Sequence, residues 1–345
     1  MPLRQAVSPH LRPPTTVAGT MRAVLYALVP GIIALIGFFG MGVVWQLLLG
    51  VTTAVATEAA MLRLRGRPLK QFLNDWSAVV TGVLLAVAIP PIAPWWLIVV
   101  GTAFALVFAK HLYGGLGYNP FNPAMVGYVV LLIAFPQIMT HWAAPAGLGG
   151  SAPGPLTSLQ VILGSGGLDG ITAATPLDQV KTELGLARTL AEIRQGELWG
   201  VLGGRGWSWV NLLFLAGGLG LIATRVIGWR IPVGVLAGIV IPAAVHWSAD
   251  PSTHPGAWFH LVSGGTMLGA FFIATDPVSA ATTPRGRLIY GTGIGALTWL
   301  IRTYGGYPDG IAFAVLLMNM AAPMIDAYTR PRVYGHRRER GGGPS

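Results

Sequence analysis

The chain has no cysteine among its 345 residues. This absence excludes disulfide bonds, a cysteine nucleophile, and iron–sulfur clusters whose thiolate ligands come from this chain. Any redox chemistry carried out here therefore needs an organic cofactor or a partner subunit.

Charged residues are also scarce. They make up 10% of the chain, against about 25% in an ordinary soluble domain, while 53% of the residues are hydrophobic. Apolar runs of about twenty residues recur along the sequence, and each is long enough to cross a bilayer as a helix. The composition predicts an all-α polytopic membrane protein. The formal net charge of +10 does not indicate a nucleic-acid partner, because the basic residues are scattered between apolar segments.

The apolar runs predict about ten transmembrane helices in two halves of five. We expect them at 22–39, 43–62, 76–91, 94–113, 124–142, 208–227, 231–248, 257–274, 287–304 and 310–327. This assigns 1–21 to an N-terminal arm, 22–142 to the first half, 143–207 to a loop between the halves, 208–328 to the second half and 329–345 to a C-terminal tail.

The distribution of Lys and Arg predicts the orientation. Most of these residues fall on one side if both termini are cytoplasmic. The start of the chain is proline-rich and lacks an apolar core directly after its first charge, so it does not resemble a signal peptide. We expect a bacterial inner-membrane protein with the 143–207 loop on the periplasmic side.

Two segments resemble each other. Residues 101–115 read GTAFALVFAKHLYGG, and residues 291–306 read GTGIGALTWLIRTYGG. They fall in the fourth and ninth predicted spans, so the second runs in the opposite direction, which predicts an inverted repeat. Chance similarity between glycine-rich helices is the alternative. Proline breaks at 90–91 and 276–277 indicate a central site, or they simply end helices.

The predicted outer loop contains the sequence DGITAATP at residues 169–176. The pattern D-x-x-[S/T]-x-A-T resembles the signal at which a flavin transferase links FMN to threonine through a phosphoester. In that interpretation Thr175 carries the FMN, and the transferase recognises Asp169, Thr172 and Ala174. Alternatively, Thr175 is a helix N-cap followed by Pro176 at the first helical position. The two interpretations are compatible, because a helix N-terminus favours a phosphate.

Polar side chains gather near the breaks: Asn119, Asn122, Thr275 and Asp276. They could contact a second flavin or line an ion path, or they could satisfy free backbone groups of interrupted helices. No histidine cluster has the spacing of metal ligands.

Other ionisable residues lie within predicted spans. We expect Glu58 to pair with the nearby Arg63, and we expect Lys110, Arg302 and Asp326 to lie at span ends, where long basic side chains reach the interface.

Several longer motifs accompany the loop pattern in order, at 114–124, 271–287, 305–310 and 318–320. Together they resemble the RnfD family, the D subunits of Rnf electron-transport complexes, and less closely the NqrB family, the B subunits of the sodium-pumping NADH:quinone reductase. The resemblance covers about 20–336. One mild departure is Thr172-Ala173, where the family usually has Ser-Gly.

The resemblance implies a complex that moves electrons between ferredoxin and NAD and couples this to sodium or proton translocation. It implies covalent FMN at Thr175, riboflavin or another non-covalent flavin as a second cofactor, and partner subunits that carry iron–sulfur clusters and flavins. A flavin transferase and membrane lipid are further expected partners. Two alternatives remain from the residues alone: a channel or secondary transporter for a small solute, and a scaffold subunit without a cofactor.

Overall fold

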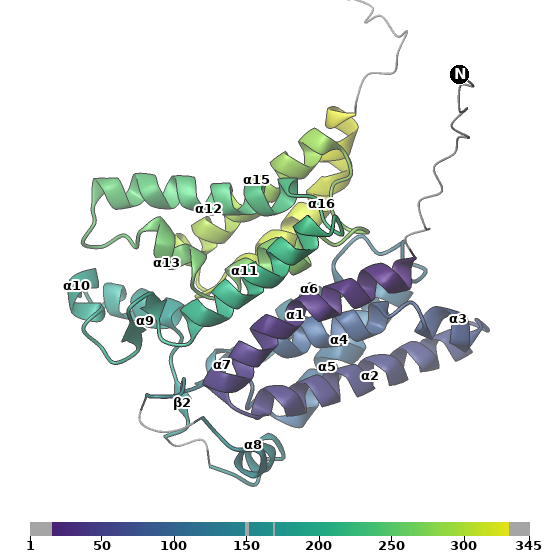
Figure 1. Cartoon of the computed structure of the whole chain (residues 1–345), viewed down its shortest axis with the longest axis horizontal. Helices are drawn as coiled ribbons and strands as arrows, with labels where there is room; N and C mark the ends of the chain where they lie inside the picture. The colour runs from purple at the N-terminus through teal and green to yellow at the C-terminus, as the bar shows by residue number, and fades with distance from the viewer. Residues whose placement is uncertain (1–15, 149–151, 168–169, 331–345) are drawn as a thin grey trace, which may run out of the picture.

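The structure is a computed structural model that describes residues 16–148, 152–167 and 170–330. These residues are mostly helical (Figure 1). The chain before residue 149 forms one group of helices: α1 (Val17–Phe39), α2 (Gly42–Leu64), α3 (Leu69–Leu73), α4 (Ser77–Ala88), α5 (Trp95–Phe104), the π-helix η1 (Ala105–His111), α6 (Pro123–Ala134) and α7 (Pro136–Thr140).

The second group follows residue 206. It consists of α11 (Trp207–Ala223), α12 (Arg230–Ala249), α13 (Ala257–Leu261), α14 (Thr266–Leu268), the π-helix η2 (Gly269–Ile273), α15 (Pro284–Tyr304) and α16 (Ile311–Thr329). Figure 1 shows the two groups side by side, with the segment that joins them at one end.

The joining segment has little regular structure. It contains the short helices α8 (Pro155–Ile162), α9 (Pro176–Gly185) and α10 (Leu190–Ile193). Two small antiparallel pairs complete it: β1 (Trp142–Ala143) with β2 (Thr172–Ala173), and β3 (Trp199–Gly200) with β4 (Gly203–Gly204).

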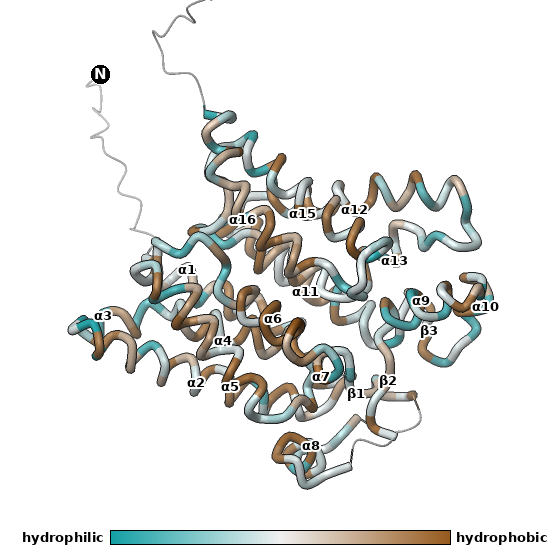
Figure 2. Tube along the Cα trace, turned by 180° about the vertical axis from the view of Figure 1, so that it is seen from behind, coloured by the Kyte–Doolittle hydropathy of each residue, from teal (hydrophilic) through white to brown (hydrophobic). Residues whose placement is uncertain are grey.

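Four helices of the described residues are long and apolar enough to cross a membrane: α1, α2, α12 and α16. The helices α4, α6, α11 and the continuous α5–η1 pair are apolar but shorter. Figure 2 shows hydrophobic residues along the long helices and hydrophilic residues near α3 and α9. The protein is therefore a mostly helical membrane protein, as its composition predicts.

The helix groups meet where small residues let α1 and α11 approach closely. Gly217 of α11 lies against the carbonyl of Ala27, and Gly31 of α1 lies against the ring of Phe214. A Cβ at either glycine would collide with these atoms. In membranes such small residues allow the close packing that holds helices together.

The fifth predicted span is wrong as a continuous helix. The expected range is 124–142, but α6 ends at Ala134 and the short α7 begins at Pro136. Phe135, between them, has φ −134° and ψ 55°. Proline lacks an N–H and disfavours helical geometry in the residue before it, so the helix is interrupted here.

The eighth predicted span, 257–274, is also wrong as a continuous helix. Residues 262–265 separate α13 from α14, and Gly264 adopts a positive φ of 59°. The Asn211 side-chain amide replaces the missing helical hydrogen bonds. It donates to the carbonyls of Val262 at 3.2 Å and Gly264 at 3.0 Å, and its oxygen accepts from the N–H of Met267 at 3.1 Å.

The break at Pro90-Pro91 lies in a buried loop between α4 and α5. The buried Gln46 side chain of α2 donates to the carbonyl of Ala93 at 2.6 Å and more weakly to that of Pro91 at 3.4 Å. Irregular backbone at membrane depth requires such partners.

Candidate functional site

Thr175 is the N-cap of α9, as the sequence predicts. Its backbone is extended (φ −74°, ψ 156°), and its hydroxyl oxygen accepts a hydrogen bond from the N–H of Asp178 at 3.2 Å. Pro176 occupies the first helical position, where a backbone N–H would have no helical partner, so proline loses no hydrogen bond there. The Thr175 side chain is half-buried, so it is neither sealed in the protein nor fully in solvent.

The neighbouring motif residues lead into this cap. Thr172 pairs with Ala143 across the small sheet and is half-buried, whereas Ala174 is exposed. Asp169 lies outside the described residues. The strand pairing fixes the register of the chain just before Thr175, so the position of its hydroxyl is determined by α9 on one side and by β2 on the other.

Thr175 borders a cavity between the two helix groups. The cavity contains about 930 Å³ of empty space, its open mouth included. Its lining comes from α1, α4, α6, α7, β1, α9, α11, α14, η2 and α16 and from the loops before α14 and α16. It is mostly apolar, and Thr140, Thr175, Asp178 and Asp309 are among its few polar groups.

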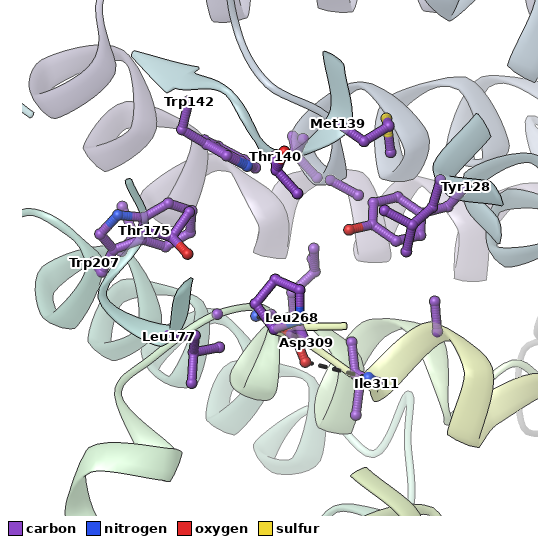
Figure 3. Close-up of a pocket in the computed structure, with 18 of the residues that line it drawn as sticks. Tyr128, Met139, Thr140, Trp142, Thr175, Leu177, Trp207, Leu268, Asp309 and Ile311 are labelled. Atoms are coloured by element: carbon purple, nitrogen blue, oxygen red, sulfur yellow. Dashed lines mark hydrogen bonds between the residues drawn. The ribbon is translucent and has the colours of Figure 1, made fainter. Parts of the chain in front are cut away.

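Aromatic side chains form part of the cavity wall. Trp142 and Trp207 pack edge to face with ring centroids 4.6 Å apart, and Phe39 packs 5.0 Å from Trp207 behind them. Figure 3 shows both tryptophans beside Thr175, and the Tyr128 hydroxyl directed into the space from the opposite side. Aromatic side chains that line a mostly apolar cavity are typical of sites that bind an aromatic ligand.

An ion pair builds another wall of the cavity. The Arg302 guanidinium contacts the Asp309 carboxylate at 3.0 Å and donates to the carbonyl of His260 at 2.8 Å. The Asp309 carboxylate also accepts from the N–H groups of Gly265 and Ile311. The loops before α14 and α16 are thus held together. Arg302 is only 5% exposed, so the expectation that it reaches the interface is wrong.

The helix that begins at Thr175 carries two further charged groups. Lys181 donates to the carbonyl of Tyr307 at 2.8 Å and also to that of Gly305. Partial burial lowers the pKa of the Lys181 ammonium, although Asp178 opposes this shift. Partial burial raises the pKa of the Asp178 carboxyl, and Lys181 and His141 oppose that shift.

A second cavity lies at the other ends of α1, α4 and α11. It brings together all four polar residues that the sequence places near the breaks: Asn119, Asn122, Thr275 and Asp276. Lys110 also lines it. On α1 the two cavities are bordered by Val24 and Leu35, which lie about 16 Å apart along a helix axis.

All four of these polar residues have structural partners. Asn122 is the N-cap of α6, Thr275 donates to the carbonyl of Phe271 at 2.7 Å, and Asp276 accepts from Ser279 at 2.8 Å. Asn119 donates from its side-chain nitrogen to the carbonyl of Phe121 at 3.0 Å, but its buried side-chain oxygen accepts no hydrogen bond from the described residues. The second cavity therefore offers a buried acceptor that a ligand with a donor group would satisfy.

The predicted partner of Glu58 is wrong. Glu58 contacts Lys110 at 2.9 Å and His111 at 3.0 Å, both from η1, and all three side chains are buried. Lys110 also donates to the hydroxyl of Ser77 at 2.8 Å. Because Lys110 is buried in the protein, the expectation that its side chain reaches the membrane interface is also wrong. Asp326 lies on α16 and accepts from Thr282 and Thr283, which ties α16 to the start of α15.

Sequence reasoning misses the aromatic wall and Asp309. The wall is formed by Trp142, Trp207 and Tyr128, which are far apart in the chain. Each alone has the sequence context of an ordinary interface or core aromatic residue. Asp309 stands in the 305–310 motif, but the motif alone gives its carboxylate no role. Among the described residues no group of three His, Asp or Glu side chains is arranged to hold a metal ion.

Comparisons with known proteins identify the family of the chain. The model of the NQR2, RnfD, RnfE family matches residues 4–335. A protein of Escherichia fergusonii, named as the D subunit of an ion-translocating oxidoreductase complex, is 51% identical and covers 98% of this chain and 100% of its own length. Proteins of the same name from Vibrio cholerae and Shewanella denitrificans are 53% and 52% identical, each over 96% of this chain and over 99% and 97% of their own lengths. This chain belongs to the NQR2, RnfD, RnfE family.

Proposed function

We propose that the chain is the flavin-carrying D subunit of an ion-translocating oxidoreductase complex in a bacterial inner membrane. In this proposal the complex moves electrons between ferredoxin and NAD and couples them to sodium or proton translocation. The chain is one subunit of that translocase and is not a complete enzyme by itself. The names of its relatives support the complex, and the site around Thr175 supports the flavin.

The observation that carries the proposal is the position of the Thr175 hydroxyl. It borders an aromatic cavity and stands at the start of a helix. FMN joined there by its phosphate would have an apolar space for its ring system and an anchor for its tail. FMN would supply the electron chemistry, while the protein would hold the ring and exclude water.

The N-terminus of α9 fits the phosphate end. The N–H groups of Leu177 and Asp178 are among those that a helix leaves without helical partners. They and the helix dipole favour negative charge at this position. Esterification leaves an oxygen on Thr175, so the hydrogen bond from Asp178 to that atom can persist.

The second cavity is the proposed place of a non-covalent flavin, riboflavin being one candidate, or of an ion path. Within the part of the chain that the structure describes, no donor reaches the buried oxygen of Asn119 there. A flavin ring N–H or ribityl hydroxyl is a matching donor. The position of this cavity at the opposite ends of α1, α4 and α11 suits a route that crosses the membrane.

We further propose ten membrane crossings in two inverted halves, with both termini cytoplasmic and the Thr175 loop periplasmic. A pair of matching contacts supports the repeat. Near the end of the α5–η1 pair, Lys110 donates to Ser77, the first residue of α4. Near the end of α15, Arg302 donates to Thr266, the first residue of α14, at 2.9 Å. Each cation also pairs with a carboxylate, Glu58 or Asp309.

The proposal includes three kinds of partner: a flavin transferase, redox subunits of the same complex, and membrane lipid. A flavin transferase needs access to Thr175, and the exposed Ala174 beside it provides an approach. Iron–sulfur and flavin subunits would exchange electrons with this chain, which supplies no thiolate of its own. Lipid would cover the exposed apolar faces of the long helices.

The test is in-gel flavin fluorescence. The chain is expressed in a host that contains the transferase, purified, and run on a denaturing gel. We expect a fluorescent band in wild type that disappears in Thr175→Ala. Thr189→Ala is the matched control, because Thr189 is the N-cap of α10 in the same loop but stands outside the motif. The control should stay fluorescent.

A dark wild-type band under these conditions contradicts the proposal. It would favour a channel or transporter for a small solute, or a scaffold subunit, because both use helices without needing a covalent flavin.

A further inference from the structure

Asp178 is a carboxyl group of the Thr175 cavity that neither the motif nor the fold requires. It lines the cavity three residues after Thr175, and its side chain is half-buried. The other carboxyl of the cavity, Asp309, is bound by Arg302 and two backbone N–H groups. Among the described residues the Asp178 carboxylate accepts no hydrogen bond, so it is the cavity acid that is free to change its protonation.

The groups around Asp178 pull its proton affinity in opposite directions. The start of α9 and the ammonium of Lys181 favour the charged carboxylate. His141, beyond α7, faces it from the first helix group and acts in the same sense when protonated. Across the cavity lie the phenol of Tyr128 and Asp309, whose charge is paired with Arg302, and the apolar wall removes water. This desolvation favours the neutral acid.

Lys181 neutralises Asp178 only in part. Its ammonium is held by the carbonyls of Gly305 and Tyr307, and no hydrogen bond or ion pair joins it to Asp178. A phosphodiester on Thr175 would add one negative charge close to the same carboxylate. A further negative charge in the cavity would then raise the affinity of Asp178 for a proton.

We propose that Asp178 is a proton-binding group linked to the charge of the cavity beside Thr175. The inference rests on the proposed function, in which a redox partner subunit delivers electrons to a flavin at this site. When one electron adds one negative charge, the Asp178 carboxylate binds one proton from water on the outer side. An O–H bond forms on Asp178, and it breaks again when the electron leaves. No bond to the flavin is made.

The first test measures the reduction potential of the covalent flavin in the intact complex as a function of pH. In Asp178→Asn the carboxylate is absent at every pH. In wild type, the plot of reduction potential against pH should bend at the pH where Asp178 loses its proton. Below that pH we expect the potential of Asp178→Asn to equal that of wild type, and above it to be higher. The variant should therefore lack this bend. Asp178→Glu should restore a bend. Glu183→Gln is the matched control, since Glu183 is a carboxylate of the same helix that does not line the cavity, and it should follow wild type.

Two results overturn the inference. One is an Asp178→Asn curve that coincides with wild type at all pH values. The other is an equal loss of the bend in Glu183→Gln, which would show a general effect of charge on the helix.

A second measurement keeps the inference testable when Asp178→Asn fails to receive flavin. Infrared titration of flavin-free Thr175→Ala protein should show a carboxylic-acid carbonyl band that disappears in Thr175→Ala/Asp178→Asn and is unchanged in Thr175→Ala/Glu183→Gln. If the band is unaffected by Asp178→Asn, Asp178 binds no proton in this cavity. If the band is present but wild type carries no flavin at Thr175, the proposed function fails while Asp178 still binds its proton.

Discussion

Lys181, on the helix capped by Thr175, donates a hydrogen bond of 2.8 Å to the carbonyl of Tyr307, which lies 126 positions later in the chain. The bond joins the outer loop to the segment that precedes α16. That segment also contributes Pro308 and Asp309 to the cavity wall. Lys181 therefore helps to fix the position of the proposed flavin anchor relative to the second helix group.

Replacing Lys181 by methionine should loosen this connection. The charge-assisted bonds to two carbonyls are lost, at roughly 1–2 kcal/mol of stability. Lys181→Arg keeps a cation and should lose less. We expect faster hydrogen exchange across 305–310 and across α9 in Lys181→Met, measured by mass spectrometry. If hydrogen exchange in both segments of Lys181→Met equals that of wild type, Lys181 does not hold the 305–310 segment against α9.

The buried Glu58–Lys110 pair makes a prediction about stability. Removing Lys110, as in Lys110→Met, leaves the buried Glu58 carboxylate with His111 as its remaining side-chain partner, and breaking a buried ion pair in this way costs roughly 3–5 kcal/mol. The double variant Glu58→Gln/Lys110→Met removes both charges and should recover part of this loss. Thermal unfolding in detergent measures the effect. Arg188→Met, which removes the exposed partner of Glu183, should change the midpoint little.

A double variant that is less stable than Lys110→Met would contradict this account of Glu58 and Lys110. It would show that the hydrogen bonds of His111 and Ser77 to the pair matter more than its charge balance.

The close contact of α1 with α11 predicts a sharp difference between two glycines of one helix. A Cβ at Gly217 collides with the carbonyl of Ala27, whereas a Cβ at Gly220 meets nothing within 4 Å. Gly217→Ala should therefore cost about 1–3 kcal/mol through overpacking. Gly220→Ala should be neutral or slightly stabilising, because alanine favours helix. Equal unfolding midpoints for the two variants would contradict the observed crossing.

Asp250, just beyond α12, predicts how one turn responds to pH. Hydrogen bonds from Ser252 and Thr253 lower the pKa of Asp250 to about 2. Because the folded pKa lies below the unfolded value of about 3.9, the turn gains its stability above that value and loses it as the pH falls toward 2. We expect the Ser252 amide to stay protected from exchange at neutral pH and to lose protection over this acid range. Asp250→Asn should weaken protection at neutral pH.

The structure also shows which features a single sequence can predict. The Thr175 cap is predictable, because a threonine followed by proline determines its own local geometry. The long helices are predictable for the same kind of reason, since each is an apolar run. The eighth span is not. Whether residues 262–265 leave the helix depends on Asn211, which supplies hydrogen bonds from more than fifty positions away.

The partners of buried charges are equally unpredictable. Arg63 lies one helical turn from Glu58 in the sequence, but Lys110 and His111 arrive through packing of η1 against α2. Arg302 likewise finds Asp309 and the carbonyls of the broken helix only in the folded chain. In contrast, the four dispersed polar residues near the proline breaks can be picked out from the sequence, and the fold gathers them into one cavity.

The most direct test of the account is the intact mass of the purified chain together with its peptide map. We predict a mass above that of the polypeptide by one FMN less one water, with the addition on the peptide that contains Thr175 and absent in Thr175→Ala. An unmodified wild-type mass, or an FMN carried on another residue, would contradict the account.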